Sequence, residues 1–313
     1  MAEKLKPLQL LRYYLVKLIM LLISLMPLSL VRTIGKWLGG INSKLQSRSN
    51  QSAKINLNLC FPDKSCQEIS LLYRKFCESR ATTILECFWA WRVSHSRLQK
   101  AITKVHNEDL VRKKMAEGRG IIFIGPHLGN WEVATSWLGL NYQSYGMYKE
   151  PKMADMGMLL REVRSNKKLQ LIEDKPQGVR AMLSALKNNQ TLIMLSDQKP
   201  GKNSGVFAPF FNQQAYTMTI LQRLMEKTDA VLIGFYAKRV DSGFEIVLSE
   251  PRGLTKDLSQ EDFAAQLNNF LASQIMECPE QFEWVYRRFK PQPGRKFCFY
   301  KCSEQQEKIK SVK

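Results

Sequence analysis

The chain has 313 residues, of which 44% are hydrophobic, so it can bury the core of one large domain or of two small ones. This composition excludes a disordered or purely fibrous protein. The formal net charge of +19 favours polyanionic partners, which include nucleic acid, anionic lipid head groups and phosphorylated substrates, without choosing among them.

Cysteine usage indicates a reducing compartment. The seven cysteines include no Cys-x-x-Cys pair, and the chain has only three histidines, so neither a zinc site nor a disulfide framework is expected. We expect reduced thiols that act mostly as small apolar residues, and a folded part that lies in the cytoplasm. The cysteines are at positions 60, 66, 77, 87, 278, 298 and 302.

The most membrane-like stretch is LIMLLISLMPLSLV, residues 18–31, which carries no charge and has basic residues on both sides. As a helix it covers about 21 Å, short of a ~30 Å hydrocarbon core, and alone it favours interfacial insertion. If Lys17 snorkels outward, residues 13–31 reach about 28 Å, so a single span stays possible despite Pro27. We predict a membrane-anchoring or interfacial helix over residues 1–36.

Two alternatives remain for this segment. A cleaved signal peptide also begins with a basic region and an apolar run, but no Ala-x-Ala-like site follows, and export would expose the thiols to oxidation. A buried core helix is the other alternative.

The rest of the chain predicts one folded domain over residues 37–313. Residues 44–118 mix polar and apolar residues at helical spacing and predict several helices. Short β-rich runs with helical stretches between them follow, and a further helix is expected at 260–276, before a basic, frayed end. The expected strands are 120–125, 191–196, 230–237 and 244–249, and the helices between them are 131–139, 154–168, 177–188 and 217–227. The alternation implies an α/β fold, a mixed, largely parallel sheet flanked by helices, with an amino-terminal membrane-associated helix.

The strand GIIFIG runs directly into a turn that carries an imidazole and a carboxylate, His127 and Glu132. Strand ends in α/β sheets are where ligands usually bind. On one continuous helix, residues at this spacing are about 140° apart, so His127 must lie in the turn. Gly129 allows the chain to bend, and a helix that begins near Asn130 would place Glu132 in its first turn beside the ring.

In that arrangement Glu132 can accept a hydrogen bond from one ring nitrogen of His127, which makes the other nitrogen a base toward a hydroxyl. The alternative is a structural histidine near a helix start. Only His127, of the histidines present, lies at a strand-to-helix turn among small residues. Hydrolase and nucleotide-binding functions are disfavoured, since no Gly-x-Ser-x-Gly elbow, His-Glu-x-x-His motif or Gly-x4-Gly-Lys-Ser/Thr loop occurs.

The stretch GPHLGNWE resembles the His-x4-Asp/Glu motif of glycerolipid-type acyltransferases, and in particular that of the lipid A late acyltransferases (lauroyl and myristoyl transferases). The resemblance covers almost the entire chain and implies that residues 37–313 form an acyltransferase catalytic domain. Four further blocks resemble this family in the expected order: NLNLCFPD (56–63), REVRSNKK (161–168), SDQKPGKNSGVFAPFF (196–211) and EWVYRRFK (283–290).

The resemblance implies that His127 is the general base and that Glu132 orients it. It implies substrate binding by Arg164, whose guanidinium suits a phosphate of the acceptor or of the donor's phosphopantetheine, by Asp197 near the active cleft, and by Asn130. A solvated helix arginine and a capping aspartate are the alternatives for the first two. The aromatic run 205–211 could line an acyl passage, lie against the bilayer or pack in the core.

The resemblance also implies a donor, an acyl chain carried as a thioester on acyl carrier protein, and an acceptor, a Kdo-bearing phosphorylated lipid A precursor. It implies no metal or organic cofactor, and an inner-membrane location with the catalytic domain on the cytoplasmic face. The basic charge suits both substrates. A lysophospholipid or glycosyl-phospholipid acyltransferase remains an alternative, as does a membrane-tethered basic binding protein, although no nucleic-acid-binding signature is present.

Overall fold

The computed structural model describes residues 6–148, 151, 153–165, 169–173, 176–290, 292–293 and 299–300. The helices are α1 Pro7–Leu25, α2 Leu28–Asn42, α3 Arg48–Cys60, α4 Cys66–Arg92, α5 His95–Ala101, α6 Glu108–Ala116, α7 Trp131–Asn141, α8 Ala154–Ser165, α9 Pro176–Lys187, α10 Ile220–Thr228 and α11 Gln260–Met276, with a 3-10 turn at Pro279–Gln281. The strands are β1 Ile102–His106, β2 Ile121–Gly125, β3 Ser144–Tyr148, β4 Leu169–Glu173, β5 Thr191–Leu195, β6 Gly205–Phe210, β7 Gln213–Met218, β8 Val231–Val240 and β9 Gly243–Ser249.

Seven of these strands form the main sheet, in the order β1-β9-β8-β2-β5-β3-β4, and β6 and β7 form a separate antiparallel hairpin. Neighbouring strands of the main sheet are parallel except β8 and β9. This confirms the prediction of a mixed, largely parallel sheet flanked by helices.

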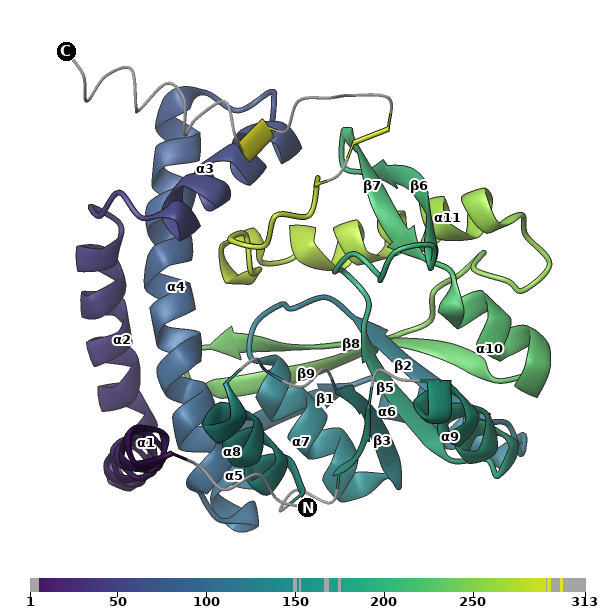
Figure 1. Ribbon diagram of the computed structural model, residues 1–313, viewed down its shortest axis with the longest axis horizontal. Helices are drawn as coiled ribbons and strands as arrows, with labels where there is room; N and C mark the ends of the chain where they lie inside the picture. Colours follow the sequence, from purple (N-terminus) through teal and green to yellow (C-terminus); the bar gives the residue numbers. More distant parts are fainter. Residues whose placement is uncertain are drawn as a thin grey trace.

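Helices cover both faces of the sheet. Ile121 and Phe123 of β2 pack in one apolar cluster with side chains of α7, whereas Ile122 and Ile124 pack in another with side chains of α9, α10 and α11. Alternate residues of a strand point to opposite faces, so a strand that is buried on both sides must be apolar throughout. Figure 1 shows α2 and α4 side by side along one flank of the molecule, with α9 and α10 at the opposite flank.

The apolar amino-terminal stretch is divided between two helices. α1 ends at Leu25 and α2 begins at Leu28, with an extended backbone at Met26 that the following Pro27 favours. One continuous helix over residues 13–31, the alternative that would give a single span, is therefore not formed. α1 alone, with 19 residues, is long and apolar enough to cross a membrane by length and composition.

The structure corrects several predicted boundaries. The four predicted strands correspond to β2, β5, β8 and β9, but β1, β3 and β4 were not expected. The helix predicted over 217–227 begins only at Ile220 because its first residues belong to β7. The run 205–211 forms β6 and the following turn, with the Phe210 side chain buried in the core. Residues 166–168, predicted as helical, lie outside the described residues.

The carboxyl ends of β3 and β5 separate from each other. Their ladder stops at the pair Gly146 and Ile193, although β5 stays paired with β2 as far as Leu195, and β3 with β4 as far as Tyr148. An opening at the carboxyl ends of parallel strands is the usual place for a ligand in an α/β fold.

Candidate active site

The histidine of the motif lies in a loop between β2 and α7 that the carboxy-terminal segment fixes in place. The backbone N–H of Gly129 donates to Gln281 O at 3.0 Å, and that of Glu283 donates to His127 O at 3.1 Å. Gly129 has φ of 59°, and an added Cβ would lie 1.8 Å from the carbonyl oxygen of Ala237. Glycine is therefore required at this position, and the loop holds the imidazole at the end of the sheet.

The imidazole of His127 pairs with Asp197, which follows β5. The distance from Nδ1 to Asp197 Oδ1 is 2.7 Å, and the Asp197 side chain is almost fully buried. Beside an ionised carboxylate, Nδ1 carries the hydrogen and donates it, so Nε2 is the basic nitrogen. No hydrogen-bond partner of Nε2 is found among the described residues.

The environment raises the pKa of His127 above its ordinary value. Burial lowers this pKa, but the negative charge of Asp197 and its hydrogen bond more than offset the effect, with smaller contributions from Glu283 and Glu132. The ring is thus a stronger base than a free imidazole.

Glu132 lies in the first turn of α7, as expected, but its hydrogen-bond partners differ from the expectation. Its carboxylate accepts from Trp91 Nε1 of α4 at 2.9 Å and from Arg164 Nη2 of α8 at 2.5 Å. The ring of His127 bonds to Asp197 instead. Burial raises the pKa of Glu132, but Arg164 and Trp91 outweigh it, so the pKa is lowered and the carboxylate stays ionised.

Arg164 comes from the last turn of α8 and lines the same cavity as Glu132 and His127. Burial lowers its pKa, but Glu132 more than offsets this effect and the net pKa is raised. Its guanidinium carbon lies 5.9 Å from the centre of the Tyr148 ring. Arg164 is therefore half of a largely buried ion pair and not a solvated helix residue.

Asn130, expected to contact substrate, is fully buried and caps α7. Its Oδ1 accepts from the backbone N–H of Val133 at 3.1 Å, and its Nδ2 donates to Glu86 Oε2 at 3.4 Å. Asparagine is a preferred residue at this helix position because its side chain satisfies a free N–H. Asn130 does not line the cavity, so the substrate-binding prediction does not fit its placement.

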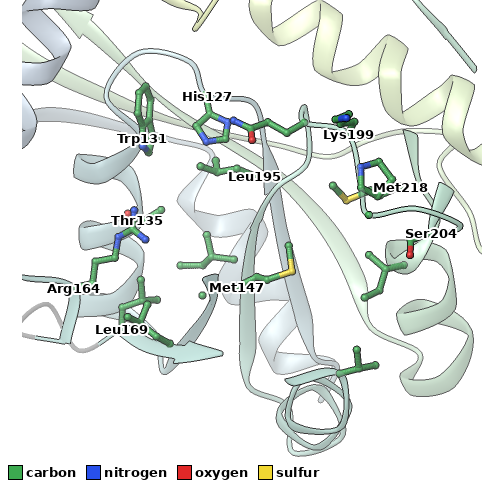
Figure 2. A pocket seen from close by; sticks show the side chains of 18 of the residues that line it. His127, Trp131, Thr135, Met147, Arg164, Leu169, Leu195, Lys199, Ser204 and Met218 are labelled. Atoms are coloured by element: carbon green, nitrogen blue, oxygen red, sulfur yellow. The ribbon is translucent and has the colours of Figure 1, made fainter. Parts of the chain in front are cut away.

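The side chains of His127, Glu132 and Arg164 open onto a cavity of about 1160 Å³ at the separated ends of β3 and β5. Figure 2 shows His127 with Trp131 and Leu195 close to it, and Met147 and Leu169 farther away. The part of the cavity between the sheet and α7 (Figure 2), here called the α7-side slot, is lined by Trp131, Glu132, Thr135, Gly146, Arg164, Leu169, Leu171, Ile193 and Leu195. The part on the opposite face is lined by Met147, Val179, Arg180, Lys199, Lys202, Met218 and Ile220.

Several residues of the site were not identified from the sequence. Trp91 lies 41 positions before its partner Glu132, and nothing in a helical stretch marks it as a donor to the site. Tyr286 lines the cavity and accepts from the Lys199 N–H at 3.2 Å. It lies in the block EWVYRRFK, which carried the resemblance but no assigned role.

The family model for bacterial lipid A biosynthesis acyltransferases matches residues 1–291 of the chain. The chain belongs to this family. It is similar to the lipid A biosynthesis lauroyltransferase of Escherichia coli, with 28% identity over 277 residues that cover 87% of this chain and 89% of the relative. It is also similar to the E. coli lipid A biosynthesis palmitoleoyltransferase, with 26% identity over 86% of this chain and 87% of that protein. A Haemophilus influenzae lipid A biosynthesis acyltransferase is 26% identical over 87% of this chain and 88% of its own. The family and these relatives support a lipid A acyltransferase.

Proposed function

We propose that this acyltransferase moves a fatty acyl chain from an acyl carrier protein thioester to a hydroxyl of a Kdo-bearing lipid A precursor. The observation that carries the proposal is the His127 ring, which lines a large, partly apolar cavity while Asp197 holds its Nδ1. An imidazole with one nitrogen held by a carboxylate is suited to take a proton from a hydroxyl at the other nitrogen.

In the proposed reaction the hydroxyl oxygen of the acceptor attacks the thioester carbonyl carbon while His127 Nε2 takes the hydroxyl proton. The tetrahedral intermediate then collapses, the carbon–sulfur bond breaks, and the proton on Nε2 passes to the leaving thiolate. Asp197 stabilises the imidazolium that exists between these steps, which corresponds to the acid's role in a catalytic triad. No serine or cysteine of the chain needs to form an acyl-enzyme.

The Glu132–Arg164 pair takes a different role from the one expected for Glu132 alone. Glu132 holds the guanidinium at the cavity wall by Nη2. Arg164 is then a fixed cation that can bind a phosphate of either substrate or the negative charge that develops on the thioester oxygen. We propose that Glu132 acts mainly by positioning Arg164.

An apolar face on α1 and α2 supports a membrane-bound enzyme. The exposed side chains of α2 include Trp37, Leu38 and Ile41. When such exposed apolar side chains become buried in the membrane interface, they drive the binding of an amphipathic helix. On α1, six leucines at helical spacing are each at least half exposed: Leu8, Leu11, Leu15, Leu18, Leu22 and Leu25.

Ion pairs on the opposite side of α1 favour a helix that lies along the membrane surface. Arg12 Nη2 donates to Asp155 at 2.6 Å, and Lys17 Nζ donates to Glu162 at 2.8 Å, both on α8. If α1 crossed the bilayer, these pairs would lie in hydrocarbon, where each charge costs about 2.5–3.5 kcal/mol. We propose that α1 and α2 bind the cytoplasmic face of the inner membrane and bring the cavity close to lipid. The free thiols among the described cysteines suit that compartment.

The test is transfer by the purified full chain in detergent micelles, followed by mass spectrometry of the lipid product. The enzyme receives acyl carrier thioester and, in parallel, the Kdo-bearing disaccharide precursor or a lysophospholipid. His127→Ala should lower turnover at least ~100-fold, the usual lower range for loss of a general base. The matched control is His106→Ala, because His106 pairs with Glu245 at the sheet edge and does not line the cavity. Full turnover by folded His127→Ala would contradict the mechanism, and acylation of the lysophospholipid alone would contradict the acceptor.

A further inference from the structure

Gly146 lies in the middle of β3. A glycine inside a strand weakens it, so its presence usually has a packing or functional cause. At other glycines of the region the backbone supplies that cause. An added Cβ would lie 2.2 Å from the carbonyl oxygen of Phe235 at Gly125, and 2.5 Å from that of Leu186 at Gly120. At Gly146 the nearest atoms belong to the Leu169 side chain, the closest at 3.1 Å, so backbone packing does not require a glycine there.

The side-chain position at Gly146 faces the α7-side slot. Gly146 pairs with Ile193 of β5 and with Leu171 of β4, and residues paired in register point to the same face of a sheet. All three line the cavity, so the glycine leaves a gap between two branched side chains on the floor of the slot, and the Leu169 side chain borders this gap. A larger residue at 146 would press against Leu169, whose Cδ2 would lie 3.1 Å from an added Cβ, and would narrow the slot there.

The slot beyond Gly146 ends at Leu169. Two residues before Gly146 on β3, Ser144 pairs with Leu169 of β4 on one side and with Thr191 of β5 on the other. From Leu195, beside the His127 loop, to the level of Thr191 is four residues of β5, or about 13 Å. Leu169 thus closes the far end of the slot, at a depth that the strands fix.

The α7-side slot suits an acyl chain better than the other part of the cavity does. Its floor consists of Leu195, Ile193, Leu171 and Gly146, and the two charged side chains that line it, Glu132 and Arg164, pair with each other. In contrast, Arg180, Lys199 and Lys202 line the opposite part and suit anionic groups. Apolar chains bind where they bury apolar surface without desolvating charges.

Resting on the proposed function, we infer that Gly146 is a specificity-determining residue that sets the length of the transferred acyl chain. The chain runs from the thioester at His127 past Leu195 and over the gap at Gly146, and its methyl end meets Leu169. A side chain at 146 shortens the space available to the chain, and a smaller residue at 169 lengthens it.

The experiment offers the full chain an equimolar series of saturated acyl carrier thioesters of different lengths and measures the length distribution of the product by mass spectrometry. One methylene in an apolar pocket is worth about 10-fold or more in specificity. We expect Gly146→Ala and Gly146→Val to change the ratio of shorter to longer products by at least about that factor toward shorter chains, and Leu169→Ala to change it toward longer chains. Met147→Ala is the matched control, since Met147 is on the same strand but lines the opposite part of the cavity, and it should keep the wild-type distribution.

An unchanged distribution in Gly146→Val and Leu169→Ala, with turnover retained, would overturn the assignment of Gly146 and leave the proposed function intact. Equal loss for every chain length in Gly146→Ala would also overturn it. Failure of the proposed function gives a different result: the wild-type chain would then show no His127-dependent transfer for any acyl length.

Discussion

Replacing Arg164 with alanine should destabilise the protein, because the buried carboxylate of Glu132 would lose its main partner. In the native protein Glu132 Oε1 accepts from Arg164 Nη2 at 2.5 Å, and the Glu132 side chain is 5% exposed. Only the Trp91 N–H remains in the variant. Breaking one side of a buried pair costs about 3–5 kcal/mol in the free energy of unfolding.

The loss of stability in Arg164→Ala should depend on pH. The folded-state pKa of Glu132 is lowered in the native protein, so the pair contributes stability above the unfolded pKa of about 4.3, and this contribution is lost as pH falls through the folded pKa. Without Arg164, the burial of the carboxyl group dominates and raises its pKa. At low pH the Glu132 carboxylate of the variant becomes protonated and no longer carries a buried, unpaired charge. The destabilisation should therefore be largest near pH 7 and should shrink as pH falls below about 5.

The assay is urea unfolding of the detergent-solubilised protein, followed by circular dichroism at a series of pH values. Lys17→Ala is the matched control, because Lys17 of α1 forms a partly exposed ion pair with Glu162, which lies on α8 like Arg164. Such a pair contributes about 0.2–1 kcal/mol. A cost for Arg164→Ala no larger than that of the control, or a cost independent of pH, would refute the reasoning.

Two further predictions concern the scaffold and the membrane face. Glu86 is fully buried between Arg32 and Arg239, at 2.7 and 2.8 Å, so Glu86→Ala should lower stability by about 3–5 kcal/mol, measured by urea unfolding. A change below about 1 kcal/mol would show that the pairs add little. The double variant Leu15→Asp, Leu22→Asp should weaken cosedimentation with vesicles of anionic phospholipid at least ~10-fold, since each buried leucine contributes about 1.5–3 kcal/mol. Unchanged vesicle binding would show that this face of α1 does not contact lipid.

The sequence predicted β2, β5, β8, β9 and the layered fold, but not β3 or the two edge strands β1 and β4. β2 and β5 are buried on both faces, so their sequences are apolar throughout and easily identified. β1, with the sequence ITKVH, and β4, with LQLIE, are edge strands of five residues that contain polar residues, and nothing local distinguishes them from helix or loop. Strands of this kind form because a neighbour offers backbone hydrogen bonds, a contact distant in the chain.

The sequence predicted which residues form the candidate site better than it predicted their hydrogen-bond partners. His127 in the turn and Glu132 in the first turn of α7 followed from strand-to-helix spacing. The partner of the ring could not be predicted, because Asp197 reaches it from a neighbouring strand, 70 positions away. Spacing along the chain favoured Glu132 as that partner, whereas side-chain direction and the donors on α4 and α8 turn Glu132 toward Trp91 and Arg164.

The most direct test of the account compares the pH dependence of turnover in Asp197→Asn and Glu132→Gln. Wild-type turnover should rise with pH through an apparent pKa above the ordinary histidine value of about 6.5, because Asp197 raises the pKa of the base. Asp197→Asn should shift this limb to lower pH and lower the maximal turnover by about 10²–10⁴-fold. Glu132→Gln should leave the limb near its wild-type position, since Glu132 contributes least to the raised pKa. A limb that shifts in Glu132→Gln and stays in place in Asp197→Asn would contradict the account.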